Sequence, residues 1–359
     1  MNARTRILGL IVLCGLAPAA VAGPLHPPAG PVASTGTPLS EMEPRTVIGP
    51  ATTPGDADSV YRITEPGSYV LAANVIGEDG KKGIEIASPG VSIDLNGFSL
   101  VGVPGSLAAV RSEPHASGAS VSNGSITDWD GAGVHLLSSG GCHVSGVRVA
   151  GSGSTAVLIG DGGLVEECVA VGSTYGYYLL PGAVARGCTA ESMLYSGFSA
   201  VRGATLEGCA AENCASDGFS ARGGSVLRGC TASANGVDGI HLDRGSTAIE
   251  CVAVDNASYG IRADDDCVVL SCTALENGDA SSTGAGIFLF GSGSRVEGNH
   301  TALNKIGIRA TGSGNLIIRN SARGNTANSF SLAGGNAAGP IIAGSQVATF
   351  ANPNCNIAY

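Results

Sequence analysis

Residues 227–242 read LRGCTASANGVDGIHL, and residues 249–263 read IECVAVDNASYGIRA. Both stretches have the same order: an apolar residue, Cys, a turn ending in Asn, then Gly-Ile. The marker cysteines stand 20, 21, 21, 21 and 21 residues apart, at Cys168, Cys188, Cys209, Cys230, Cys251 and Cys272. A period of this length is typical of a solenoid, in which each repeat buries its apolar side only by stacking on its neighbours.

The marker column extends beyond cysteine in both directions, through Gly97, Gly124, Gly146, Asn299 and Asn320. Five residues after the later markers comes a second column, which consists of Asn235, Asn256, Asn277, Asn304 and Asn325. An asparagine repeated at one turn can hydrogen-bond the backbone and its equivalents on the neighbouring repeats, and it tolerates a sharp corner. We therefore predict a structural asparagine ladder.

A third column holds the apolar residue after Gly, as in Ile240 and Ile261, and the residue two positions later is also apolar or small. Because side chains alternate between the two faces of a strand, the residue between them should point outward. The predicted outward strip consists of His135, Leu158, Tyr178, Ser199, Ser220, His241, Arg262, Phe288 and Arg309.

The six marker cysteines are expected to be buried and unpaired. Equivalent atoms on stacked parallel strands lie about 4.8 Å apart, which exceeds the Cβ separation of roughly 3.5–4.5 Å that a disulfide needs. They would then act as small apolar residues. Cys142, Cys214, Cys267 and Cys355 lie off this column, and the sequence leaves their state open.

The two ends of the chain differ from the repeats. Residues 1–22 have a basic start, an apolar run and an Ala-Val-Ala site, which is typical of a secretory signal peptide. Residues 23–41 are rich in Pro, Gly, Ser and Thr and predict a flexible leader. We assign 42–330 to the solenoid with an N-terminal cap and 331–359 to a C-terminal tail. No other apolar run is long enough for a membrane span.

The formal net charge of −10 comes without any basic cluster, so a nucleic acid is not expected as a partner. With a signal peptide, the protein is expected to be secreted, periplasmic or on the cell surface. The oligomeric state is not predicted.

The repeat resembles that of right-handed parallel β-helix proteins of the secreted bacterial type, related to carbohydrate-binding and sugar-hydrolase members. The resemblance rests on the 21-residue period, the Asn column and the DGF, DGI and YGI strand starts, and it covers about 83–330. It implies an all-β fold of about ten rungs. The chain lacks the Asn-Thr-Asp and Arg-Ile-Lys motifs of polygalacturonase-like members. It also lacks the Asp-Pro-His motif that follows Tyr-Gly in alginate-epimerase-like ones, so the resemblance implies no particular reaction.

The best candidate site lies on the rungs of residues 236–266. The candidates for catalysis are Asp243, Asp264, His241 and Arg262, and those for substrate binding include Asp238, Arg244 and Tyr178. By register Asp243 and Asp264 would be stacked, near the separation of roughly 5–5.5 Å used by retaining glycosidases. A lyase or epimerase would instead use a base with a cationic group, as His241 and Arg262 could provide. The alternative is that these charges form a solvated surface.

Two further interpretations concern a metal and a second site. No metal or other cofactor is expected, apart from a candidate Ca²⁺ site at Asp264, Asp265 and Asp266. Trp129, the only Trp, lies with His135 near an inserted loop and could stack on a sugar ring if exposed. The alternative is that Trp129 packs under the neighbouring loop.

The sequence thus predicts a secreted β-helix protein that binds an extracellular polysaccharide. Processing of the bound chain by a lyase, epimerase or glycoside hydrolase reaction remains open. The competing hypothesis is a non-catalytic structural or adhesive rod at the cell surface.

Overall fold

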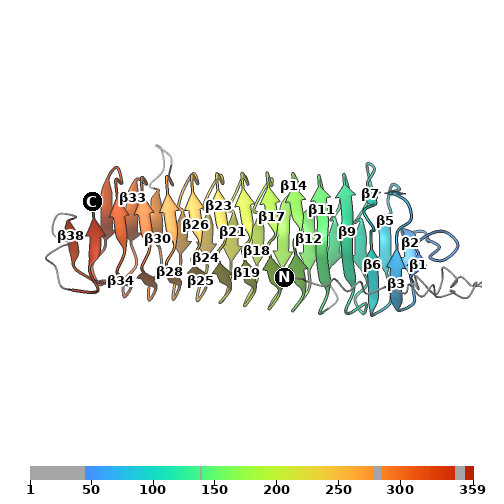
Figure 1. Ribbon diagram of the computed structural model, residues 1–359, viewed down its shortest axis with the longest axis horizontal. Helices are drawn as coiled ribbons and strands as arrows, with labels where there is room; N and C mark the ends of the chain where they lie inside the picture. Colours follow the sequence, from blue (N-terminus) through green and yellow to red (C-terminus); the bar gives the residue numbers. More distant parts are fainter. Residues whose placement is uncertain (1–44, 138–139, 279–283, 344–351) are drawn as a thin grey trace, which may run out of the picture. The chain divides into compact units, whose positions relative to one another are not determined.

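The computed structural model describes residues 45–137, 140–278, 284–343 and 352–359, which belong to one compact unit, 44–359. The described residues contain only β-strands, turns and irregular segments, and their strands stack along one axis (Figure 1). None of them forms a helix that is long and apolar enough to cross a membrane. The predicted signal peptide, 1–22, and leader, 23–41, lie outside the described residues.

Each complete turn contributes three short strands, so the coil has three faces. The first face is a 13-stranded parallel sheet with one strand per turn. Its strands are β2 (Ser59–Ile63), β5 (Lys82–Ile86), β8 (Val110–Ser112), β10 (Val134–Leu136), β12 (Thr155–Ile159), β15 (Tyr175–Leu179), β18 (Phe198–Ala200), β21 (Phe219–Ala221), β24 (Ile240–Leu242), β27 (Ile261–Ala263), β30 (Ala285–Leu289), β33 (Ile306–Ala310) and β36 (Asn328–Leu332).

The other two faces form a single 26-stranded sheet, because β9 (Ser120–Thr127) and β11 (His143–Ala150) run through the corner between them. Besides these two, one face contains β1 (Thr46–Val47), β3 (Gly67–Val70), β6 (Val91–Asp94), β13 (Leu164–Glu166), β16 (Val184–Arg186), β19 (Thr205–Glu207), β22 (Val226–Arg228), β25 (Thr247–Ile249), β28 (Val268–Leu270), β31 (Arg295–Glu297), β34 (Leu316–Ile318) and β37 (Ala337–Ala338). The other contains β4 (Val75–Ile76), β7 (Ser99–Val101), β14 (Val169–Val171), β17 (Thr189–Glu191), β20 (Ala210–Glu212), β23 (Thr231–Ser233), β26 (Val252–Val254), β29 (Thr273–Leu275), β32 (His300–Ala302), β35 (Ser321–Arg323), β38 (Ile341–Ala343) and β39 (Asn356–Ala358).

The coil is longer than the sequence predicted. The first face has 13 strands where about ten rungs were expected, so the predicted number is too low. The extra turns lie before the first predicted marker, Gly97, which follows β6, and after the last, Asn320, at the C-terminal end. There, strands of the predicted tail, 331–359, pair with β34 and β35.

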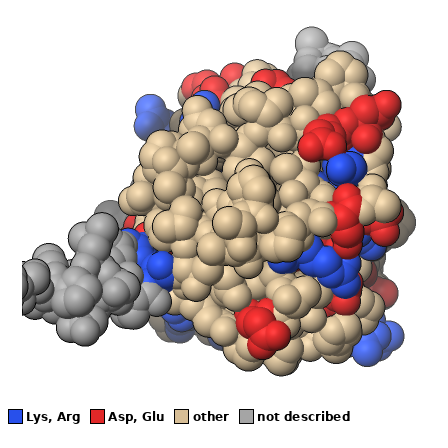
Figure 2. All heavy atoms as spheres, turned by 90° about the vertical axis from the view of Figure 1, so that its right-hand side faces the viewer, with Lys and Arg blue, Asp and Glu red and all other residues tan. Residues whose placement is uncertain are grey.

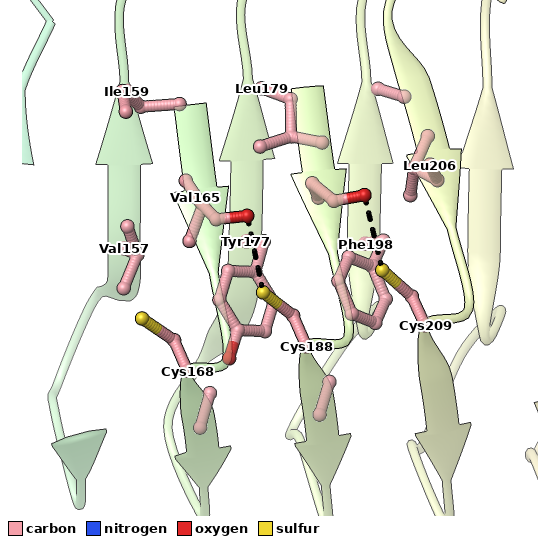
Figure 3. Close-up of a cluster of buried hydrophobic side chains, with 14 of the residues drawn as sticks. Val157, Ile159, Val165, Cys168, Tyr177, Leu179, Cys188, Phe198, Leu206 and Cys209 are labelled. Atoms are coloured by element: carbon pink, nitrogen blue, oxygen red, sulfur yellow. Dashed lines mark hydrogen bonds between the residues drawn. The ribbon is translucent and has the colours of Figure 1, made fainter. Parts of the chain in front are cut away.

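Left-handed backbone residues turn the chain between faces. Gly208 and Glu250 each precede a marker Cys and have φ of 59° and 55°. This conformation turns the following cysteine into the interior, where the Cys188 sulfhydryl donates to the Val165 carbonyl at 3.5 Å (Figure 3). All six marker cysteines are buried and free, which confirms the prediction; Cys142, Cys214 and Cys267 are also buried and free, and Cys355 is free and half-buried.

Apolar side chains from the three faces fill the interior, and equivalent residues pack on one another from turn to turn. The rings of Tyr177 and Phe198 stack at 4.6 Å between centroids, and Phe198 stacks on Phe219 at 4.8 Å. Figure 3 shows Tyr177 and Phe198 packed behind the cysteine column. Repeating the same side-chain shape on successive turns gives a continuous core without long-range crossovers.

Asparagine side chains hydrogen-bond one another along the inside of one corner. Nδ2 of Asn235 donates to Oδ1 of Asn256 at 2.9 Å, and Nδ2 of Asn256 donates to Oδ1 of Asn277 at 2.8 Å. The series continues from Asn277 to Asn304 at 3.1 Å and from Asn304 to Asn325 at 3.2 Å. These amides satisfy backbone groups that the corner removes from the sheets, as the buried polar groups of a folded protein require.

Figure 2 looks onto the N-terminal end of the coil, where the strand ladders stop. Uncharged residues cover most of this end, and acidic and basic groups gather mainly along one side. Arg62 contributes ion pairs to Asp56, Glu85 and Glu113 in these first turns. Charged side chains at the last strand of a sheet discourage the addition of further strands.

Candidate functional site

The outer side of the 13-stranded sheet carries the predicted outward strip. The strand register pairs His135 with Leu158, Tyr178 with Ser199, and His241 with Arg262. One side chain per turn therefore points away from the core at a fixed position, which confirms the predicted register of the strip. Phe288 is the exception in exposure, because neighbouring side chains bury it.

Two adjoining cavities lie over this strip. The first, of about 390 Å³, is lined by Leu137, Ser154, Thr155, Leu158, Tyr175, Tyr178, Ser199, Ala200, Val201 and Arg222. The second, of about 530 Å³, is lined by Tyr175, Tyr195, Ser196, Ser199, Ser216, Asp217, Ser220, Arg222, His241, Asp243 and Asp264. Tyr175, Ser199 and Arg222 line both, so we treat the two cavities as one continuous groove.

Aromatic side chains form the wall where the two cavities meet. The rings of Tyr175 and Tyr195 stack with 5.0 Å between centroids and 17° between planes. Tyr195 is 53% exposed, so its ring is accessible from solvent. Tyr178, predicted as a binding residue, lines the first cavity. Accessible tyrosine rings of this kind offer an apolar face together with a polar hydroxyl.

His241 lies between two carboxylates in the second cavity. Its Nε2 is 3.3 Å from Asp264 Oδ2, and its Nδ1 is 3.8 Å from Asp217 Oδ2. The nearby carboxylate of Asp217 raises the pKa of His241, although burial and the charge of Arg262 act in the opposite direction. The imidazole is about three-quarters buried, so the protonated ring is held by charge rather than by water.

Arg262 is held next to this cluster by two neighbours. Its Nε donates to Asp264 Oδ1 at 3.3 Å, and its guanidinium carbon lies 5.0 Å from the centre of the Phe290 ring. Asp264 therefore accepts from Arg262 while it contacts His241. His241, Asp264 and Arg262 thus form one set of contacts, in which His241 and Asp264 line the second cavity and Arg262 lines neither cavity.

Asp217 also belongs to the cluster, although the sequence pattern predicted only a strand start at this position. Its Oδ1 accepts the backbone N–H of Asp238 at 3.1 Å, and Asp238 Oδ1 accepts the backbone N–H of Tyr259 at 3.1 Å. The repeat of Asp before Gly at 217 and 238 could have identified it as part of a column on adjacent turns.

Asp238, predicted to bind substrate, is inaccessible. The residue is only 3% exposed, and burial, followed by the charge of Asp217, raises its pKa. Its carboxylate holds the backbone of the next turn. Burial to this extent contradicts the predicted direct contact between Asp238 and a substrate.

Asp243 and Arg244 lie at the corner that follows β24. Asp243 lines the second cavity, on the turn next to that of Asp264, and its Oδ1 accepts the Arg244 backbone N–H at 2.7 Å. Arg244 Nε donates to Asp266 at 3.2 Å, and Arg244 is absent from the linings of both cavities. Stacking of the Asp243 and Asp264 carboxylates stays a prediction.

The three carboxylates of the candidate calcium site have different partners. Asp264 contacts His241 and Arg262, Asp265 Oδ1 accepts the backbone N–H of Ser292, and Asp266 accepts from Arg244. Within the described ranges, no group of three or more His, Cys, Asp or Glu side chains is arranged to hold a metal ion. This geometry gives the predicted calcium site no support.

Trp129 is fully buried, so the predicted stacking of an exposed indole on a sugar is wrong. Its Nε1–H donates to the Leu100 carbonyl at 3.1 Å. A Cβ on Gly83 or Gly77 would lie 2.7 Å or 2.9 Å from the ring, so glycine at these positions provides the space that the indole fills. The alternative interpretation is right that the indole is buried, and the contacts that bury it include Gly77, Gly83 and the Leu100 carbonyl.

His135 lies on β10, two residues before Leu137, the first residue of the lining of the first cavity. It is half-buried, and burial and the charge of Arg111 lower its pKa. It does not line either cavity and does not meet Trp129 in an accessible site. The second predicted site is therefore not formed.

Family comparisons identify the fold. The model described as "Right handed beta helix region" matches residues 109–263, and that of the periplasmic copper-binding protein NosD matches 192–337. The chain is thus a right-handed parallel β-helix protein, as predicted. The copper binding in the second description is not carried over, since the described residues present no cluster of metal-ligating side chains.

Two solved structures have the same fold at low sequence identity. The A-module of the mannuronan C-5 epimerase AlgE4 from Azotobacter vinelandii is 15% identical, with a TM-score of 0.58, over 76% of this chain and 90% of its own. The tailspike protein of the Escherichia coli bacteriophage HK620, solved with a pentasaccharide, is 10% identical, with a TM-score of 0.59, over 82% of this chain and 72% of its own. No curated protein matches the sequence.

Proposed function

We propose that this protein binds an extracellular polysaccharide along the groove on the outer side of the 13-stranded sheet. The observation that carries the proposal is the continuity of the two cavities through Tyr175, Ser199 and Arg222. Stacked tyrosines in the middle of the groove lead to the hydrogen-bonding cluster of Asp217, His241 and Asp264. Aromatic faces with a few placed polar groups are the usual composition of a ligand site.

The length of the groove suits a chain rather than a single sugar. It reaches from Leu137, directly after β10, to Asp264, directly after β27, which is a distance of six strand spacings. At about 4.8 Å per spacing this amounts to about 29 Å. An extended oligosaccharide can lie along the axis and place successive rings over successive turns.

The fold comparisons support this proposal by analogy. One similar structure is named for an enzyme of mannuronan, and the other was solved with a pentasaccharide. A shared fold does not establish a shared ligand. We also propose, from the signal-peptide pattern, that the protein meets its ligand outside the cytoplasm.

A glycan array with the mature protein is the first test. For a glycan that binds, Tyr175→Ala combined with Tyr195→Ala should weaken affinity at least tenfold, because both ring faces at the centre of the groove are lost. His241→Ala combined with Arg262→Ala should weaken it similarly without unfolding the coil. Val252→Thr is the control, since Val252 is exposed on a different face.

Two outcomes would contradict the proposal. Full affinity in both double variants would place the binding site elsewhere, and the absence of any glycan ligand would favour the structural or adhesive rod.

A second candidate function is cleavage of the bound chain. It is favoured by the position of Asp217 and Asp264 on opposite nitrogens of His241, which offers two carboxylates and a proton carrier in one accessible cavity. The test is a reducing-end assay with the glycan that binds. New reducing ends that Asp264→Asn abolishes would support cleavage, and a bound but unchanged glycan would exclude it.

A further inference from the structure

The charge of the groove distinguishes between classes of polysaccharide. Three carboxylates line the second cavity, from Asp217, Asp243 and Asp264, against one guanidinium, from Arg222, and the imidazole of His241. The balance of these lining side chains is −1 when His241 is protonated and −2 when it is neutral. Arg262 lines neither cavity but donates to Asp264, and counting it brings the balance to 0 and −1. The lining itself is therefore negative in either state.

The positive groups near the cavity already have carboxylate partners. His241 lies between Asp217 and Asp264, and Arg262 donates to Asp264. A carboxylate of a uronic acid would have to displace these partners, and it would come close to Asp243 with only Arg222 to offset the repulsion. Like charges brought together in this way are a common means of excluding a wrong ligand.

An ammonium group would be attracted by the same carboxylates that repel a uronic acid. It has three N–H donors and no acceptor, and the carboxylates of Asp217 and Asp264 are 16% and 24% exposed at the cavity. Charge-assisted hydrogen bonds of this kind are about twice as strong as neutral ones. The faces of Tyr175 and Tyr195 at the same cavity attract a cation as well as an apolar sugar face.

We propose that the groove selects a polysaccharide with free amino groups, that is, a partly or fully de-N-acetylated hexosamine polymer, and rejects polyuronates. The ammonium groups would lie at Asp217, Asp243 and Asp264, and the sugar rings would lie against the tyrosines. This inference rests on the proposed function, because it names the class of polysaccharide for the same groove. The net charge of −10 on the whole chain would also attract a cationic polymer from a distance.

Calorimetric titration of the mature protein with three β-1,4-linked hexasaccharides tests the inference: one of glucosamine, one of N-acetylglucosamine and one of mannuronate. The glucosamine hexamer should bind at least tenfold more tightly than the N-acetylated one, and the mannuronate hexamer should not bind measurably. Added salt should weaken the first interaction far more than the second, because exposed charges are screened.

Charge-removing variants locate the effect. Asp243→Asn and Asp217→Asn should each reduce the preference for the free amine at least threefold, while affinity for the N-acetylated hexamer stays within twofold. Glu191→Gln is the matched control, because it removes the same charge from an exposed position on another face. The Asp243 variant is informative even if Asp217→Asn disturbs the backbone at Asp238, since Asp243 holds a different group, the Arg244 N–H, which the asparagine oxygen can still accept.

The outcomes separate this inference from the proposed function. Binding of the mannuronate hexamer with equal or higher affinity than the glucosamine hexamer overturns the charge argument and leaves the groove as a polysaccharide site. Equal affinity for the amino and N-acetyl hexamers also overturns it. Failure of all three to bind, together with an empty glycan array, removes the proposed function and this inference with it.

Discussion

Replacing Asn256 with alanine tests the asparagine series at a residue that is linked to both of its neighbours in the series. The Asn256 side chain makes four hydrogen bonds and is 1% exposed. Its Nδ2 donates to the Ala232 carbonyl at 3.2 Å and to Asn277 Oδ1 at 2.8 Å. Its Oδ1 accepts from the backbone N–H and the Nδ2 of Asn235, at 3.1 Å and 2.9 Å.

The expected loss follows from these contacts. A buried hydrogen bond contributes about 0.5–1.5 kcal/mol net, so four bonds amount to about 2–6 kcal/mol. Alanine leaves the partners on two neighbouring turns without an amide, and the corner has little freedom to relax because the strands on both sides are paired. We expect Asn256→Ala to lower the free energy of unfolding by about 3–5 kcal/mol, within that range.

Urea unfolding, followed by far-ultraviolet circular dichroism, measures this quantity. Fluorescence of Trp129, the only tryptophan, reports separately on the N-terminal turns, so a difference between the two signals would show that the damage is local. Val252→Thr is the control on the same turn, because Val252 is 37% exposed. If Asn256→Ala unfolds within about 0.5 kcal/mol of the parent, the range of ordinary surface substitutions, the amide series does not stabilise the coil.

Three further predictions concern other parts of the molecule. Thiol titration of the denatured, unreduced protein should count at least six free thiols from the column Cys168 to Cys272, and fewer when native; a disulfide within the column, found by mass spectrometry, would contradict this. Because the pKa of His241 is raised above 6.5, its contribution to stability is complete below pH 6.5 and is lost as the pH rises through the folded-state pKa. The free energy of unfolding should therefore fall over that range, and a His241→Gln variant with the same pH profile as the parent would refute the assignment. Trp129→Phe should destabilise the coil by about 1–3 kcal/mol, through the Leu100 carbonyl that loses its donor, and leave glycan affinity unchanged; a loss of affinity in the folded variant would show that Trp129 contacts the ligand.

The fold could be predicted because the residues at its corners repeat with the period of the turns. Each corner needs a left-handed residue followed by a small or amide side chain directed inward, so Cys251 and Asn256 recur at fixed intervals. The predicted number of turns was too low because the terminal turns use other residues at these corners. β2, for example, pairs with β5 in parallel register but precedes the first predicted marker, Gly97.

The sequence predicted which positions of successive turns are equivalent in the candidate site, but not which of their side chains are exposed. Trp129 follows a left-handed residue, Asp128, just as Asn256 follows Asp255, and this column faces inward on every turn. The position alone therefore argued for a buried indole. Asp217 and Asp238 occupy equivalent positions and each accepts a backbone N–H of the next turn, yet only Asp217 lines the groove, a difference in exposure that a repeat pattern does not encode.

The division between scaffold and site explains how one coil can acquire a specific ligand. On β24, Ile240 and Leu242 are fully buried, and His241 between them carries the outward position. A change at His241 therefore alters the groove without opening the core, whereas a change at either neighbour leaves a cavity in a stacked column. Ligand chemistry is concentrated in one outward position per turn and in the residues that flank it at the corners. The charge balance of those positions, rather than the β-helix itself, is what should determine the polysaccharide that binds.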